Sequence, residues 1–163
     1  MLTDVMGDSS DNLRYLPVGL DVRGRLCVIA GGGDVGTRKA LTLLRAGASV
    51  TVISPAVTGE IARQIEAGRL RWLEGDARIE HLRDAFLVIA ATDDDSVNAE
   101  IVRAAIDQGS LVCDASSAER SQVIFGALLT REGVTVSVFT DGRDPSLARR
   151  TRDRIADLMS QSE

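Results

Sequence analysis

Short apolar runs alternate with amphipathic stretches over the first two thirds of the chain. Continuous apolar or β-branched runs are typical of strands that are buried on both faces of a sheet. Residues 86–91 show this pattern most clearly, and residues 25–30, 49–54, 70–73 and 111–113 are also predicted to be strands. Apolar residues recur every three or four positions in three segments between them: residues 37–46, 57–67 and 96–108. Strands alternating with helices of this length predict βαβ units and a parallel sheet with right-handed crossovers.

The pattern changes after residue 114. Residues 123–130 and 134–139 are two extended runs joined by a glycine-containing turn at 131–133, which predicts a hairpin. Asp144 and Pro145 then provide an N-cap and a first-turn proline for a final helix. We expect an apolar stripe on that helix at Leu147, Thr151, Ile155 and Leu158. An isolated hairpin is marginally stable in water, so this one must pack on another surface, and a partner subunit is a candidate.

Composition and charge exclude several classes of protein. The chain has 163 residues, of which 44% are hydrophobic, so it can form one ordinary domain with a small appendage. Its longest apolar runs, such as residues 86–91, are too short to cross a bilayer. A net charge of −5 argues against broad nucleic-acid binding, which needs a basic face.

The chain ends and the cysteines favour a cytoplasmic protein without a metal site. Residues 1–12 are acidic and polar and lack the basic start and apolar core of a signal peptide, so we expect a cytoplasmic location. Cys27 and Cys113 both lie inside apolar segments. Buried free thiols are therefore expected, since one pair of cysteines makes no metal-binding framework.

A glycine-rich turn carries the first functional signal. Gly31, Gly33 and Gly36 match G-x-G-x-x-G, directly after a predicted strand and at the start of a predicted helix. The first glycine permits the tight turn, the second lets the backbone approach a pyrophosphate, and the third lets the helix pack close to the strand. The phosphates then meet free N–H groups at the helix N-terminus. The turn therefore predicts a dinucleotide site.

The second strand ends without the acidic residue that usually binds the adenosine ribose. Its end reads Ser54, Pro55 and Ala56, and Ser54 offers only a weaker hydrogen bond. No arginine follows immediately to hold a 2′-phosphate. Spacing alone therefore leaves NAD and NADP open.

The fourth strand ends on the other side of the expected switch point. Thr92 and Asp93 follow it and are expected to face the cleft near the nicotinamide end of the cofactor. Asp94 and Asp95 precede the next helix, where carboxylates cap the N-terminus and favour its dipole.

Three segments together resemble a known family. They are LCVIAGGGDVGTRKA at residues 26–40, IAATDDDSVN at 89–98, and VTVSVFTDGRDPSLAR at 134–149. The chain resembles the dehydrogenase domain of siroheme synthase, the precorrin-2 dehydrogenase/sirohydrochlorin ferrochelatase family, from about Tyr15 to Leu158. The glycine motif is generic, but its combination with AATDDDSVN is specific.

The resemblance implies an activity and a domain plan. The activity is oxidation of precorrin-2 to sirohydrochlorin with NAD as hydride acceptor, and some family members also insert ferrous iron. The implied fold is α/β, a Rossmann-like doubly wound parallel sheet followed by a small hairpin-plus-helix dimerisation domain, which predicts a homodimer. The expected parts are a flexible tail at 1–14, an NAD-binding domain at 15–114 and a dimerisation and substrate segment at 115–163.

The resemblance also assigns site residues. Asp34, Val35, Pro55 and Ala56 fall where the family contacts NAD. The family's proposed catalytic aspartate lies four residues after the cysteine that closes the fifth strand, but here that position is Ser117. A serine is no general acid or base of that kind, because its pKa lies far from neutral.

The replacement leaves Asp114, three residues earlier, as the nearest carboxylate. Asp114 takes over the catalytic role or the chemistry relies on the acidity of the substrate. The alternative for Asp114 is a structural Asx turn.

The substrate of this family, a tetrapyrrole carrying many carboxylates, should prefer a cationic cleft. The segment 143–154 has five arginines against two aspartates in a chain that is acidic overall. We expect substrate contacts from Arg120, Arg143, Arg149 and Arg150. A solvated helix face is the alternative for these arginines.

Two other functions compete with a dehydrogenase. A non-catalytic nucleotide-sensing module, such as the regulatory domain of a potassium transporter, also pairs this glycine turn with one Rossmann unit. Such modules usually have the acidic residue after the second strand and lack a hairpin followed by an arginine-rich helix. A family member that has lost activity and only binds tetrapyrrole is kept open by Ser117.

Overall fold

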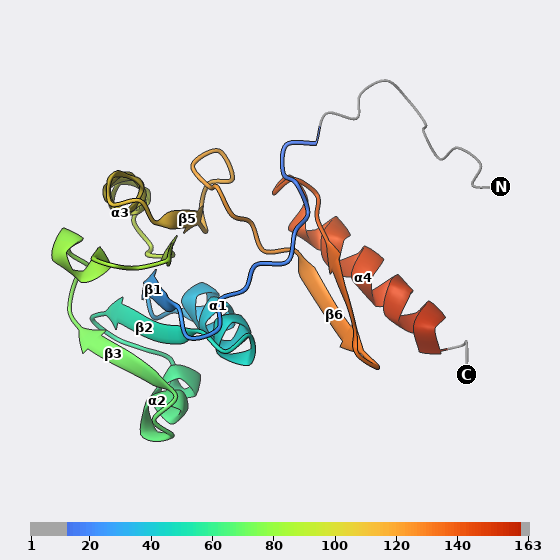
Figure 1. The fold of residues 1–163 in the computed structure, drawn as a ribbon, viewed down its shortest axis with the longest axis horizontal. Helices are drawn as coiled ribbons and strands as arrows, with labels where there is room; N and C mark the ends of the chain where they lie inside the picture. The colour runs from blue at the N-terminus through green and yellow to red at the C-terminus, as the bar shows by residue number, and fades with distance from the viewer. Residues whose placement is uncertain (1–12, 161–163) are drawn as a thin grey trace. The chain divides into compact units, whose positions relative to one another are not determined.

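The computed structural model describes residues 13–160 (Figure 1). By its internal contacts the chain divides into two compact units, Gly19–Phe125 and a second unit of residues 13–18 with 126–160. The flexible tail expected at 1–14 lies outside the described residues over positions 1–12.

The larger unit is a five-stranded parallel sheet with helices. The strands are β1 (Leu26–Ala30), β2 (Ser49–Ser54), β3 (Leu70–Glu74), β4 (Leu87–Ala90) and β5 (Leu111–Asp114). The connections contain α1 (Asp34–Arg45), α2 (Gly59–Glu66), the 3₁₀ helix η1 (Ile79–Leu82) and α3 (Asp95–Asp107). The strand order is β3-β2-β1-β4-β5. The chain adds β2 and β3 on one side of β1 and then β4 and β5 on the other side, which confirms the expected Rossmann-like winding.

The strands alternate their side chains between two apolar layers. Cys27 and Ile29 of β1 belong to the layer that includes Leu43 of α1. Val28, from the same strand, belongs to the other layer, which includes Val102 of α3. Because β1 and β4 are covered on both faces, their sequences are continuously apolar, whereas the edge strand β3 carries the exposed Arg71. Cys27 and Cys113 are free and buried, as expected.

The N-termini of α1 and α3 follow directly on the loops at the carboxyl edge of the sheet. The helix expected from residue 37 begins at Asp34, because the glycine turn leads directly into its first turn with Gly33 as N-cap. Asp94 caps α3 as expected: its Oδ1 accepts hydrogen bonds from the backbone N–H groups of Ser96 at 2.8 Å and Val97 at 3.2 Å.

The smaller unit is an antiparallel hairpin that packs against one helix. Strands β6 (Ala127–Arg131) and β7 (Val134–Val138) are joined by Glu132 and Gly133, both with positive φ. Helix α4 (Pro145–Ser160) packs on both strands and begins with the expected cap, since Asp144 Oδ1 accepts from Leu147 N at 2.8 Å.

Two expectations for this region are wrong in detail. The first hairpin strand starts at residue 127 rather than 123, because the backbone N–H groups of Gln122 and Val123 donate instead to Val112 O on the open side of β5. On α4, Thr151 and Ile155 are half-buried, but Leu147 and Leu158 are 45% and 64% exposed. The residue of the helix that is buried is instead the small Ala148.

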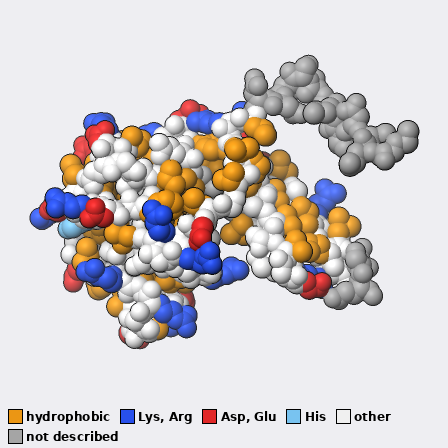
Figure 2. Space-filling model, in the orientation of Figure 1, with side chains coloured by type: hydrophobic (Ala, Val, Ile, Leu, Met, Phe, Trp, Pro, Cys, Tyr) orange, Lys and Arg blue, Asp and Glu red, His pale blue; other side chains and the backbone are white. Residues whose placement is uncertain are grey.

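Hydrophobic side chains consequently gather on the surface of the hairpin and α4 (Figure 2). No helix within residues 13–160 is long and apolar enough to span a membrane.

Candidate dinucleotide-binding site

The loops that follow β1 and β4 touch at the switch point, and they touch at a glycine. A Cβ on Gly31 would lie 2.1 Å from Ala91 O, and the φ of Gly31 is +117°. A Cβ on Gly36 would lie 2.1 Å from Gly31 O, so α1 closes directly onto the turn. Neither position accepts a side chain, and the two glycines bring both loops and the helix N-terminus together.

Gly33 differs from these two glycines because the space beside it is open. A Cβ built there has no heavy atom within 4 Å. Gly33 is the N-cap of α1 and has no side chain, so no N-cap side chain accepts a hydrogen bond from the N–H groups of the first helical turn. An empty space left by a missing side chain, next to helix N-terminal donors, fits a pyrophosphate. Asp34 and Val35 are both exposed in the same turn.

The loop after β2 is fastened to the glycine turn. A Cβ on Gly32 would lie 2.3 Å from Ala56 O, and Thr58 N donates to Gly32 O at 3.1 Å. The hydroxyls of Thr37 and Thr58 are 2.8 Å apart and share a hydrogen bond. The segment expected to face the ribose therefore lies against the turn, with Ser54 nearly buried and Pro55 and Ala56 exposed.

The loop after β4 is organised by a buried asparagine that the sequence reading missed. Asn98 Oδ1 accepts from Thr92 N at 3.0 Å, and Asn98 Nδ2 donates to Thr92 O at 3.1 Å. The Thr92 hydroxyl also contacts Asn98 Oδ1, at 2.7 Å. Thr92 is thus half-buried and internally bonded, whereas Asp93 beside it is exposed.

Asp114 closes β5 with a side chain that has no exposed surface. Its Oδ1 accepts from Ser116 N at 2.9 Å, the Asx turn that was its structural alternative, and from Ser116 Oγ at 2.7 Å. Arg120 Nε donates to Asp114 Oδ2 at 2.6 Å. Burial alone would raise the pKa of Asp114, but the hydrogen bonds from Ser116 and Arg120 outweigh it and lower the pKa below its ordinary value.

Arg120, expected to bind substrate, is already held by two carboxylates. Besides Asp114, it pairs with Asp95 at the start of α3 through both terminal nitrogens. These hydrogen bonds hold the pKa of Asp95 below its ordinary value. Sequence reasoning missed this link, because 25 positions separate Asp95 from Arg120 and only the fold brings them together. Ser117 is half-buried in the same turn, where its Oγ accepts from Arg120 N at 3.4 Å.

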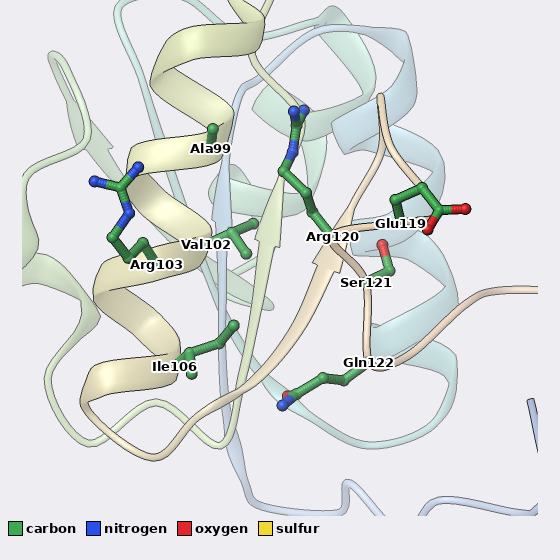
Figure 3. Close-up of a pocket in the computed structure, with 8 residues that line it drawn as sticks. All are labelled: Ala99, Val102, Arg103, Ile106, Glu119, Arg120, Ser121 and Gln122. Carbon is green, nitrogen blue, oxygen red and sulfur yellow. The ribbon is translucent and has the colours of Figure 1, made fainter.

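A shallow hollow of about 360 Å³ lies beside this network, between α3 and the segment 119–122 (Figure 3). Ala99, Val102 and Ile106 give it an apolar wall. Arg120 is the one residue among its lining that was predicted for the site. The hollow is therefore separate from the glycine turn.

The remaining predicted residues, Arg143, Arg149 and Arg150, lie in the smaller unit. All three are exposed, and Arg150 Nη1 donates to Ser146 Oγ at 2.8 Å within α4. Their carboxylate-binding role stays a prediction.

Comparison with known proteins identifies the family of the chain. A family model described as putative NAD(P)-binding matches residues 18–127. The chain is 37% identical to siroheme synthase of Photorhabdus laumondii over 91% of its length and 32% of that protein. It is 38% identical to siroheme synthase of Nitrosospira multiformis, over 90% of this chain and 32% of that protein. The chain thus spans about a third of the length of these curated relatives.

A solved structure extends the likeness to the whole fold. SirC, a precorrin-2 dehydrogenase, matches with a TM-score of 0.78 and 32% identity, over 88% of this chain and 70% of that one. The family assignment confirms the expected nicotinamide dinucleotide cofactor. The chain belongs to the putative NAD(P)-binding family, and within it to the group of the SirC precorrin-2 dehydrogenase.

Proposed function

We propose that this chain oxidises precorrin-2 to sirohydrochlorin in siroheme or cobalamin biosynthesis, with NAD as the oxidant. The reaction removes two electrons and two protons from the tetrapyrrole, as a hydride delivered to NAD and a proton released. One observation carries the proposal: the likeness to SirC covers 88% of the chain, and the matching family model spans the glycine turn.

The chain's own contribution is binding and orientation. Bound NAD would supply the hydride acceptor in its nicotinamide ring. The open space at Gly33 and the first turn of α1 would hold the pyrophosphate. The loop after β4 meets the glycine turn at Ala91, so Thr92 and Asp93 follow directly on the expected nicotinamide side.

The proton that leaves precorrin-2 needs an acceptor, and Asp114 and Ser117 stay the candidates. The lowered pKa keeps Asp114 ionised, so it cannot donate a proton near neutral pH and is a weak base. Its buried pairing with Arg120 favours a positioning role. We therefore infer that the acidity of the substrate itself drives proton release, with Asp114 holding the turn in place.

The smaller unit would supply substrate contacts and a subunit interface. Exposed arginines on and before α4 suit the carboxylates of a tetrapyrrole. The exposed hydrophobic side chains of Leu147 and Leu158 suit a homodimer, which a mass measurement in solution tests directly. We place the reaction in the cytoplasm, where free thiols such as the two buried cysteines stay reduced. Insertion of ferrous iron into the product would be a second activity.

A family member that binds but does not turn over is the second candidate, favoured by Ser117 and by the engaged Asp114. An anaerobic assay separates the two. The purified chain is mixed with precorrin-2, with and without NAD, and the tetrapyrrole absorbance is followed. We expect the sirohydrochlorin spectrum only with NAD. Binding of both ligands without this change would support the binding protein.

A further inference from the structure

The end of β2 lacks the carboxylate that a bound adenosine ribose usually meets, but the neighbouring strand provides one. Ser54 closes β2, and Glu74 closes β3. The two residues are direct partners in the parallel register of the sheet. Neither residues 54–58 nor residues 74–77 include a lysine or arginine that would attract a 2′-phosphate.

The register places Ser54 and Glu74 on the same face of the sheet. Side chains alternate along a strand, so residue 74 shares its face with Leu70 and Trp72. These two belong to the same apolar layer as Val52, two residues before Ser54. Adjacent strands lie about 4.8 Å apart, and a glutamate is one methylene longer than the usual aspartate. The longer side chain covers part of that extra strand spacing toward the glycine turn.

Two hydrogen bonds fix the ends of both strands together. Ser54 O accepts from the Trp72 indole N–H at 2.9 Å and from Gly75 N at 3.2 Å. Ser54 itself meets the glycine turn, since a Cβ on Gly32 would lie 3.0 Å from the Ser54 Cβ. The strand end that carries Glu74 is therefore held in a fixed position beside the predicted ribose site.

The Glu74 carboxylate is not engaged by another group within residues 13–160. Its side chain is exposed, and among residues 13–160 no hydrogen bond or ion pair engages it. An ionised carboxylate offers two acceptor oxygens, which match the two neighbouring hydroxyls of a ribose. It also repels a phosphate at the 2′ position.

We infer that Glu74, supplied from β3 instead of β2, binds the adenosine ribose hydroxyls and makes this site select NAD over NADP. The inference rests on the proposed dinucleotide binding and adds the residue that decides between the two cofactors. Glu74 would make no contact with the reacting atoms, so its replacement should change the affinity for the cofactor and not the chemical step.

Equilibrium binding of the reduced cofactors to the full chain tests the inference. Trp72 is the only tryptophan of the chain, and its hydrogen bond to Ser54 places it at this strand end, so energy transfer from Trp72 to NADH or NADPH reports binding. We expect Glu74→Gln to weaken NADH binding about tenfold or more and to strengthen NADPH binding, because the repulsion of the 2′-phosphate is removed. Glu74→Arg should reverse the preference toward NADPH.

Glu66→Gln is the matched control, because Glu66 is exposed at the end of α2 and the substitution removes the same charge. It should leave both affinities unchanged. NADH affinity of Glu74→Gln equal to that of the parent would overturn the inference and leave dinucleotide binding intact. A parent chain that binds neither cofactor would overturn the inference together with the proposed function.

Discussion

Arg120 Nε donates a 2.6 Å hydrogen bond to Asp114 Oδ2, a carboxylate with no exposed surface. The same guanidinium pairs with the exposed Asp95. Arg120 therefore joins the end of β5 to the start of α3, at the edge of the sheet where the predicted catalytic turn begins. A buried carboxylate of this kind is stable only while its partner is present.

Arg120→Gln should lower the free energy of unfolding by about 2 to 3 kcal/mol, because it leaves the Asp114 charge buried without its cation. Urea denaturation measures the change. Asp95→Asn is the control: it breaks only the exposed half of the network and should cost less than about 1 kcal/mol. Equal losses of unfolding free energy in the two variants would show that the buried Arg120–Asp114 pair stabilises the fold no more than the exposed Arg120–Asp95 pair.

The stability of the chain should fall in acid partly through Asp114. Its pKa in the folded chain lies below the unfolded value of 3.8, so its contribution is present above that value and is lost as pH falls through the folded pKa. Unfolding free energies from neutral pH down to about pH 3 should therefore decline more steeply for the parent than for Asp114→Asn. Parallel curves would mean that Asp114 titrates alike in both states.

The glycines of the turn should separate folding from cofactor binding. Gly33→Ala adds a methyl group to open space, so it should change the unfolding free energy by less than about 1 kcal/mol. The same methyl group occupies the predicted pyrophosphate position and should weaken NADH binding at least about tenfold. Calorimetry of NADH binding and thermal unfolding of one sample give both values.

Gly31→Ala should behave in the opposite way. Its Cβ would collide with Ala91 O on a backbone of φ +117°, so we expect a loss of more than about 3 kcal/mol or no folded protein. A stable Gly31→Ala variant with weakened NADH binding would contradict the packing role given to Gly31.

The exposed arginines of α4 should act on the tetrapyrrole and leave the cofactor unaffected. Replacing Arg149 and Arg150 by glutamine should raise KM for precorrin-2 about tenfold without changing KM for NAD, because charge-assisted hydrogen bonds to carboxylates are lost. Arg45→Gln, an exposed arginine at the end of α1, is the control. If the α4 double variant keeps the parent KM, these arginines form only a solvated helix face.

The parallel sheet could be predicted because its inner strands β1 and β4 are covered on both faces and therefore carry continuous apolar runs. Ser49–Ser54 was predicted with its observed bounds, and the expected caps at Asp94 and Asp144 are present. These features depend on neighbouring residues alone. The late start of β6 could not be predicted, because the N–H groups of Gln122 and Val123 bond across the chain to β5.

The candidate site was predictable where one segment carries it and unpredictable where two segments meet. The glycine turn has its own spacing, so Gly31, Gly33 and Gly36 were found directly. Asn98 and the partners of Arg120 act across loops, and no local pattern marks them. Glu74 is inconspicuous in the sequence, since its place beside Ser54 depends on strand order and register.

The most direct test of the proposed activity is the ratio of products in an anaerobic reaction of the purified chain with precorrin-2 and NAD. Absorbance of NADH and of the tetrapyrrole is recorded together until the reaction stops. A hydride transfer to NAD requires one NADH for each sirohydrochlorin formed. Binding of both ligands with no NADH, or sirohydrochlorin formed without NADH, would contradict an NAD-dependent dehydrogenase.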